Sequence, residues 1–146
     1  MTRVGLLLAL GTMIGPLAGC GGSAPVNVST TDKTEQIHVN SLTQLADLMR
    51  IRQEDAGKPP EKAADLAKYE KAYPFGYSEL KRGGIVLVYG APIADGVSDK
   101  VLAYEKAAPE SGGNVLMQDG RTVKKMTAEE FKTAPKAPGN AEAKAK

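Results

Sequence analysis

His38, the single histidine of the chain, is the first place to look for chemistry in this sequence. As a catalytic base it would need a nucleophile and an acid that orients its ring. Ser41 and Asp47 are nearby in sequence, but Ser41 also fits the cap of a predicted helix. We therefore expect His38 to lie partly exposed at a domain edge, without a catalytic role.

Other chemical patterns are equally sparse. The 17 acidic residues select no particular carboxylate pair for glycoside hydrolysis. Residues 95–99 (DGVSD) form an oxygen-rich loop that could hold Ca²⁺, but Asp, Gly and Ser also build ordinary turns. One Cys and one His exclude a multi-Cys or His-rich metal site within one chain. We expect no catalytic residue, no metal and no cofactor; a small hydrolase or a carbohydrate-binding protein remains an alternative and requires a pocket with convergent polar groups.

The charge and aromatic content narrow the class of partner. Nineteen basic and 17 acidic residues give a net charge of +2, which is too even for a nucleic-acid-binding domain. Aromatic residues make up 5% of the chain and Trp is absent, so no base-stacking platform is indicated. Tyr69, Tyr73 and Tyr77 recur at steps of four and are a candidate binding face. The alternative is a half-buried row that packs on the sheet.

The N-terminus carries a targeting pattern. Arg3 precedes an apolar run over residues 4–14, which is too short for a spanning helix of about 20 residues but typical of a signal peptide. The run is followed by Leu17-Ala18-Gly19-Cys20, which resembles a bacterial lipobox. The resemblance implies cleavage between Gly19 and Cys20 and attachment of acyl chains to Cys20, which would hold the protein at the membrane on its extracytoplasmic side, facing the periplasm or the cell surface. The alternative is an ordinary secretory signal with a chance Cys, or a weak membrane anchor.

The composition then divides the chain into four parts. Residues 1–19 are the expected lipoprotein signal peptide, and residues 20–36 are rich in Gly, Ser and Thr, which predicts a flexible tether. Residues 37–133 form the expected folded domain. Residues 134–146 consist mainly of Ala, Pro and Lys and predict a disordered tail.

Two helices are predicted at the start of the domain. Ser41 and Gln44 fit a capping box, and the apolar residues that follow recur at helical spacing as far as about Asp55. A second helix is expected to start at Pro60 and to stop at Pro74. A short turn or helix over residues 77–80 should close at Gly83.

Strands follow. Residues 85–89 (IVLVY) predict a central strand buried on both faces, and residues 101–105 predict a second strand. Residues 114–126 predict a hairpin with a type I′ turn at Asp119-Gly120, which would pair Gln118 with Arg121 and Leu116 with Val123. Both faces of this hairpin are partly apolar, so the pattern leaves open which one faces inward.

A capping box formed by Thr127 and Glu130, with Met126 and Phe131 as a hydrophobic staple, predicts a short helix over residues 128–132. The expected architecture is therefore α+β: two N-terminal helices, then a small antiparallel sheet of about four strands with a short C-terminal helix.

This order of elements, together with the ending GGNVLMQDGRTVKKM, resembles the soluble part of prepilin-like type II secretion proteins (pseudopilins). Gly112 to Leu116 and Asp119-Gly120 match the C-terminal module of one subfamily, whereas Pro109 stands where that module has His. The lipobox also replaces the long apolar pilin helix. The resemblance implies the fold, but the missing helix argues against assembly into a filament.

From the lipobox, the tether and the lack of a reactive cluster, we expect a lipid-anchored interaction domain without catalytic activity that binds an unknown envelope protein and no nucleic acid. The alternative is an accessory component of a type II secretion or pilus-like machine, which the pseudopilin-like ending favours.

Overall fold

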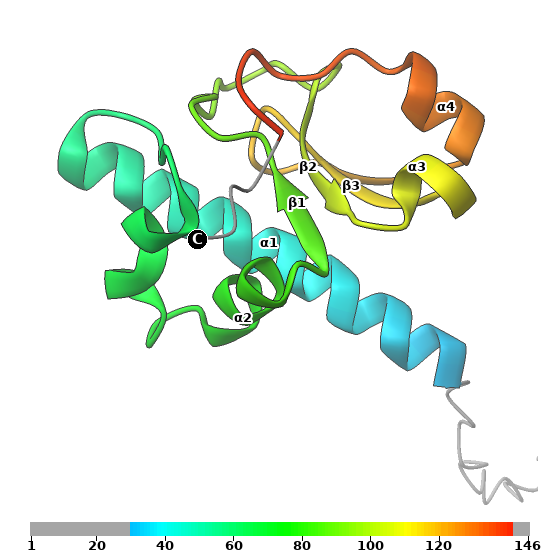
Figure 1. Ribbon diagram of the computed structural model, residues 1–146, viewed down its shortest axis with the longest axis horizontal. Coiled ribbons are helices and arrows are strands. Elements are labelled where there is room, and N and C mark those ends of the chain that lie inside the picture. Colours follow the sequence, from blue (N-terminus) through cyan, green and yellow to red (C-terminus); the bar gives the residue numbers. More distant parts are fainter. Residues whose placement is uncertain (1–29, 142–146) are drawn as a thin grey trace, which may run out of the picture.

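The computed structural model describes residues 30–141, which form helices around a four-stranded antiparallel sheet (Figure 1). The chain begins with the long helix α1 (Thr30–Ala56), followed by the 3₁₀ helix η1 (Ala63–Tyr69) and α2 (Pro74–Arg82). The remaining elements are β1 (Ile85–Leu87), β2 (Val101–Glu105), α3 (Ala108–Ser111), β3 (Gly113–Met117), β4 (Val123–Met126) and α4 (Ala128–Thr133). The expected α+β class, with a four-stranded antiparallel sheet and a short C-terminal helix, is confirmed. No helix within these residues is long and apolar enough to cross a bilayer.

Helix α1 starts eleven residues before the position that the capping pattern predicted. Residues 30–36, expected to belong to a flexible tether, are helical, because no Gly or Pro interrupts the chain between Thr30 and Ala56. Ser41 is therefore not a cap: it lies within the helix, and its Oγ donates to the Ile37 carbonyl at 2.8 Å. The signal peptide, Cys20 and residues 21–29 lie outside the described residues.

The two prolines act differently from the prediction. The predicted second helix is only the 3₁₀ helix η1, and Pro74 does not stop it but opens α2 at the first helical turn. Proline is tolerated there because its missing N–H would have no intrahelical partner. Gly83 closes α2 as expected, with φ 74° in the left-handed region.

The sheet has the order β1-β2-β3-β4, so β1 is an edge strand and the prediction of a central strand is wrong. Ile85 and Leu87 are nonetheless buried, and Val86 between them is half-buried. The reason is that α2 and η1 supply apolar cover, and the chain just after β1 is flanked by a C-terminal segment: Tyr89 and Asn140 exchange two backbone hydrogen bonds of 2.8 and 2.9 Å. An apolar run in the sequence indicates that the side chains are buried. Helices and other segments of the chain can bury a strand that has a neighbouring strand on only one side.

The hairpin has the predicted register, with Leu116 opposite Val123. Its turn is wider than a type I′ turn, because Gly120 N donates to Met117 O at 3.0 Å and Gln118 does not pair with Arg121. The Asp119 carboxylate holds the loop, accepting from the backbone N–H groups of Arg121 and Thr122 at 3.0 and 2.9 Å. Burial raises the pKa of Asp119, but the hydrogen bonds from Thr122 and Arg121 outweigh it, so the net pKa is lowered.

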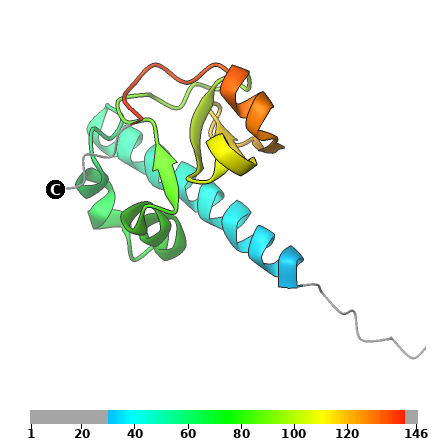
Figure 2. The ribbon, with the colours of Figure 1, turned by 45° about the vertical axis from the view of Figure 1, so that its right-hand side comes forward.

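Both faces of the sheet are covered, which settles what the hairpin pattern left open. Leu116 and Val123 face α1 and join the larger core, whereas Val115 and Met117 face the opposite side and pack with Phe131 of α4. Figures 1 and 2 show α1 crossing one face of the sheet, with α3 and α4 on the other side and α2 beyond α1. Because successive side chains of a strand point to opposite faces, the sheet contributes to two separate hydrophobic cores.

The first part of the expected disordered tail is ordered against the sheet. Ala137 is buried, and residues 135–137 run beside Val101, whose N–H donates to Pro135 O at 2.8 Å. Residues 142–146 lie outside the described residues. The tail composition contains few apolar residues, but backbone groups can pair with a sheet irrespective of side chain.

The contact between α1 and α2 depends on a glycine. A Cβ at Gly76 would lie 2.6 Å from Leu45 N and 2.9 Å from Gln44 C, both rigid backbone atoms. We expect Gly76→Ala to lower the free energy of unfolding by about 1–3 kcal/mol, because the overpacking outweighs the gain of about 1 kcal/mol in helix propensity. Urea unfolding measures this. Ser78→Ala, in the same helix, should change stability by no more than about 0.5 kcal/mol; equal effects of the two substitutions would contradict the packing argument.

Candidate functional site

An open groove of about 740 Å³ lies between the first turns of α1 and the ends of β2, β3 and β4 that are farthest from the hairpin turn. Its other walls are the end of α3 and the start of α4. Side chains that matter for its chemistry are Glu35, His38, Glu105, Glu110, Asn114, Lys125, Glu129 and Glu130. We refer to this hollow as the α1 groove.

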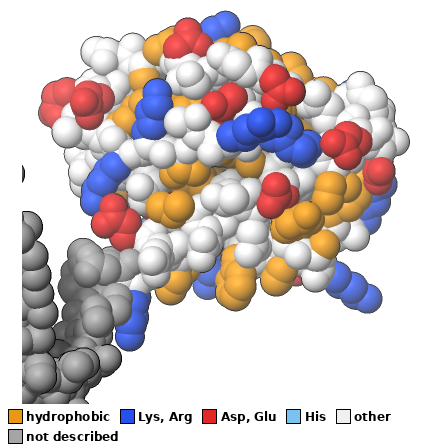
Figure 3. Space-filling model, turned by 180° about the vertical axis from the view of Figure 1, so that it is seen from behind, with side chains coloured by type: hydrophobic (Ala, Val, Ile, Leu, Met, Phe, Trp, Pro, Cys, Tyr) orange, Lys and Arg blue, Asp and Glu red, His pale blue; other side chains and the backbone are white. Residues whose placement is uncertain are grey.

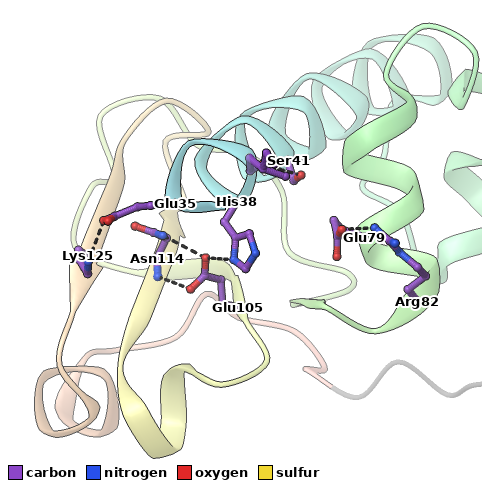
Figure 4. Close-up of polar contacts among 9 residues, drawn as sticks. Glu35, His38, Ser41, Glu79, Arg82, Glu105, Asn114 and Lys125 are labelled. Atoms are coloured by element: carbon purple, nitrogen blue, oxygen red, sulfur yellow. Dashed lines mark hydrogen bonds and ion pairs between the residues drawn. The ribbon is translucent and has the colours of Figure 1, made fainter. Parts of the chain in front are cut away.

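The Glu105 carboxylate is the centre of the α1 groove (Figure 4). Its side chain is only 14% exposed, and it accepts three hydrogen bonds. His38 Nδ1 lies 2.6 Å from Oε1, and Asn114 donates from its backbone N at 2.9 Å and its Nδ2 at 3.0 Å. When the carboxylate is ionised it can only accept, and His38 Nδ1 is then the donor in this contact. One side chain thus joins α1, β2 and β3.

A second polar contact runs parallel to the first. Lys125 of β4 donates to Glu35 of α1 at 2.8 Å. The hydrogen bond and charge of Glu35 raise the pKa of Lys125, which keeps its ammonium charged. Since Glu35 and His38 are three residues apart on a helix, they project from the same side of α1 toward the sheet.

The strand register explains why these partners meet. Asn114 lies directly opposite Lys125, and Tyr104 lies opposite Val115, which puts Glu105 beside Asn114. Glu105, Asn114 and Lys125 therefore form a polar row across three strands on the face that α1 covers. Towards the other ends of β3 and β4 this same face is apolar, with Leu116 and Val123 in the core.

The rim of the α1 groove is acidic and partly unpaired. Glu110 and Glu129 are exposed, and among the described residues their side chains make no hydrogen bond or ion pair. Glu130 is bound by the cap of α4: hydrogen bonds with Thr127 lower its pKa. Five carboxylates face one lysine and one histidine across the groove, so its field is negative.

Within the described residues, no serine hydroxyl forms a hydrogen bond with His38. Ser111 Oγ donates to Ala107 O at 3.2 Å, and the fully buried Ser41 donates to its own helix. The pair formed by His38 and Glu105 has the geometry of a base and its orienting acid, but neither of these serines can be its nucleophile as it stands. What the arrangement does plainly is fix the walls of a charged groove.

The three tyrosines of the candidate binding face are separated by the fold. Tyr77 is 7% exposed and belongs to the main core, so the expectation of a shared face is wrong for it. Tyr73 and Tyr69 are half-buried against the same core, and the Tyr69 hydroxyl donates to Asp55 Oδ2 at 2.7 Å. This hydrogen bond, followed by that of Lys68, lowers the pKa of Asp55. The packing alternative thus describes this row better.

The acidic loop over residues 95–99 is paired with two arginines from other parts of the domain. Asp95 Oδ1 lies 3.9 Å from Arg50 Nη1 and 3.6 Å from Arg121 Nη2. Within residues 30–141, no group of three or more His, Cys, Asp or Glu side chains is arranged to hold a metal ion. Residues 95 and 96 form a turn, in which Val97 N donates to Ala94 O at 3.1 Å. Gly19 and Cys20 lie outside the described residues.

Sequence reasoning placed His38 at a domain edge, and its ring is in fact about half exposed, with 45% of its side chain accessible. It missed Glu105 as the partner, because that residue is 67 positions away. It also missed the acidic rim and the link between Glu35 and Lys125. One signal was available: the predicted hairpin register already places Asn114 opposite Lys125.

Because Glu105 accepts from three donors, it cannot be replaced by its amide without conflict. We expect Glu105→Gln to lower the free energy of unfolding by about 1–3 kcal/mol, since its NH₂ group would face a donor and leave a partly buried N–H unpaired. Urea unfolding of the full chain measures the loss. Glu110→Gln, on the exposed rim, should be neutral within about 0.5 kcal/mol. A Glu105→Gln variant as stable as the Glu110→Gln variant would show that the carboxylate does not organise the α1 groove.

Comparisons were made with protein-family models, with curated proteins and with solved structures. None of the three finds a match to this chain.

Proposed function

We propose that this chain is a lipid-anchored, extracytoplasmic interaction domain without catalytic activity, and that an envelope partner binds in its α1 groove. The observation that carries the proposal is the position of the groove: two of its polar side chains, Glu35 and His38, stand on the first turns of α1, the described element that follows Cys20 in the sequence.

The lipobox-like sequence Leu17-Ala18-Gly19-Cys20 supports the anchor. Two or more acyl chains hold a protein at a bilayer where a single chain would not. Thr30 follows Cys20 by about ten residues, and an extended residue spans at most about 3.6 Å, so the start of α1 stays within about 36 Å of the acylated sulfur. A partner in the α1 groove would be met close to the membrane.

The charges of the α1 groove support a partner that presents lysine or arginine. Glu110 and Glu129 stand on the two helical walls without a partner of their own among the described residues, and the field of the other carboxylates adds to theirs. Glu105, His38 and Asn114 are already bound to one another, so the groove does not have to be ordered on binding. Preorganisation of this kind lowers the cost of association.

A second candidate is an accessory component of a type II secretion or pilus-like machine. The observation that favours it is the order of elements: a long N-terminal helix that packs on an antiparallel meander with the strand order β1-β2-β3-β4. This order agrees with the resemblance of the sequence to the pseudopilins.

The anchor makes a direct prediction. In the native host, we expect the purified chain to begin at Cys20 and to carry the mass of its acyl chains, because the thiol is the attachment point. Cys20→Ser should leave the protein out of the membrane fraction. Intact mass spectrometry and membrane fractionation measure this, with Ser23→Ala as the matched control. An unmodified thiol at Cys20, or a retained leader peptide, would remove the anchor from the proposal.

The α1 groove makes a separate prediction. A photo-crosslinker at Glu129 should capture a discrete envelope partner, whereas the same group at Glu61, an exposed residue outside the groove, should not. The double variant Glu110→Gln/Glu129→Gln, probed through a crosslinker at Ser111, should reduce capture by about tenfold, since two charge contacts together contribute on the order of 1.4 kcal/mol.

The charge-matched control is Glu54→Gln/Glu70→Gln, with both acids exposed and outside the groove. An equal loss in this control would contradict the groove as the binding site. Identification of the captured protein as part of a secretion machine would favour the second candidate over a different envelope partner.

A further inference from the structure

Two large apolar side chains remain exposed in the described part of the chain. Ile37 of α1 is 52% exposed and Phe75 of α2 is 61% exposed. Other large apolar residues of these helices, such as Leu45 and Leu80, are buried in the main core. Ile37 and Phe75 therefore stand out as apolar surface that the domain does not use for its own folding.

Both side chains lie on the same side of α1. The Gln44 carboxamide accepts from Phe75 N at 3.0 Å and from Gly76 N at 3.2 Å, which fixes the start of α2 against this turn of α1. Ile37 precedes Gln44 by about two helical turns and so lies on the same line along the helix. We call Ile37 and Phe75 the apolar face. Figures 1 and 2 show α2 on the side of α1 away from β2 and β3.

The apolar face is held firmly. Phe75 follows Pro74 at the start of α2, and its backbone is bound to Gln44, so its position is set by the packing of two helices. An exposed lysine precedes it: Lys71 lies four residues before Phe75, outside α2, and has no ion-pair partner among the described residues. Arg82, by contrast, is paired with Glu79. In the view from behind in Figure 3, acidic and basic side chains are interspersed with apolar ones, so on that side no single sign of charge dominates.

The α1 groove lies on a different side of α1. Successive residues turn by about 100° around a helix, so His38 and Glu35 point well away from the line of Ile37 and Gln44. The contacts agree, because His38 and Glu35 bind Glu105 and Lys125 of the sheet, whereas Gln44 binds α2. A surface that covered the apolar face would leave the groove open to water.

The length of chain before α1 indicates what that surface is. Cys20 is at most about 36 Å from Thr30 along an extended chain, and Gln44 lies about 21 Å further along α1. A domain anchored at Cys20 can therefore lay α1 along the bilayer and bring both residues of the apolar face to the surface together. Attachment to one membrane raises the local concentration of the face at the lipid, so a weak apolar contact suffices.

We propose that the apolar face, Ile37 and Phe75, rests in the interfacial region of the bilayer in the anchored protein, with Lys71 at the level of the lipid headgroups. This inference rests on the proposed lipid anchor and adds the orientation of the domain. Phe and Ile partition into the acyl boundary, and lysine stems reach from there to the headgroups. The α1 groove then faces the aqueous side, where a soluble segment of a partner can enter it.

The absence of Trp from the chain gives a clean test. Phe75→Trp places one fluorophore on the apolar face, and Lys132→Trp places one on α4, on the far side of the sheet. Each full-length, acylated variant is reconstituted into vesicles that contain brominated lipid, after its lipid mass has been confirmed. We expect the emission of the residue 75 probe to be quenched at least about threefold more than that of the residue 132 probe, because an interfacial indole lies among the acyl chains.

Equal quenching of the two probes would overturn the orientation while leaving the anchor intact. Quenching that is absent from vesicles, together with a blue shift that grows with protein density, would assign the apolar face to a second copy of the chain and would also overturn the proposal. If the chain purified from its native host carries no acyl mass, the proposed anchor is removed, and with it the orientation. Ile37→Trp provides an independent probe of the same face should the Phe75→Trp variant fold poorly.

Discussion

The carboxylate of Glu105 is the contact around which the end of the domain that contains the α1 groove is organised. A carboxylate that is 14% exposed loses most of its hydration and must recover it from protein donors. It does so from one residue of α1 and one of β3, through three hydrogen bonds of 2.6 to 3.0 Å. Together with the contact between Glu35 and Lys125, these hydrogen bonds join the first turns of α1 to the sheet beside the α1 groove.

The two ends of the sheet contribute differently to the structure. Toward the turn of the hairpin, Leu116 and Val123 bury apolar surface against α1, and the opposite face does the same with Phe131. Toward the other end, Glu105, Asn114 and Lys125 replace apolar side chains with polar ones on the α1 side. Apolar packing supplies stability without direction, whereas the polar row accepts only one arrangement of its partners. Apolar packing therefore stabilises the domain near the hairpin turn, and the polar row sets the arrangement of its partners at the other end of the sheet.

Helix α1 joins three surfaces with different roles. Its core side carries Leu42, Leu45 and Met49, its sheet side carries the residues that line the α1 groove, and the side toward α2 carries Ile37 and Gln44. Because these sides diverge around one rigid helix, their relative directions are fixed once the helix has formed. This is the physical basis for the proposed division between a face toward lipid and a groove toward a partner.

Features that depend on neighbours along the chain can be predicted from the sequence. The hairpin register between Leu116 and Val123, the capping box of Thr127 and the closure of α2 at Gly83 all follow from local backbone preferences and side-chain spacing, and so does the α+β class. Local signals predict less where the same residues are compatible with two structures. Ser41 can cap a helix or lie inside one, and Pro74 can end a helix or begin one. An apolar run is compatible with a central strand and equally with an edge strand that a helix covers. The candidate site could not be predicted in this way, because His38 and Glu105 are 67 positions apart. No periodicity along the chain indicates which distant donors will bind a largely buried carboxylate. Long-range pairing is settled by the packing of whole elements, and that packing brings together residues that look unremarkable in sequence.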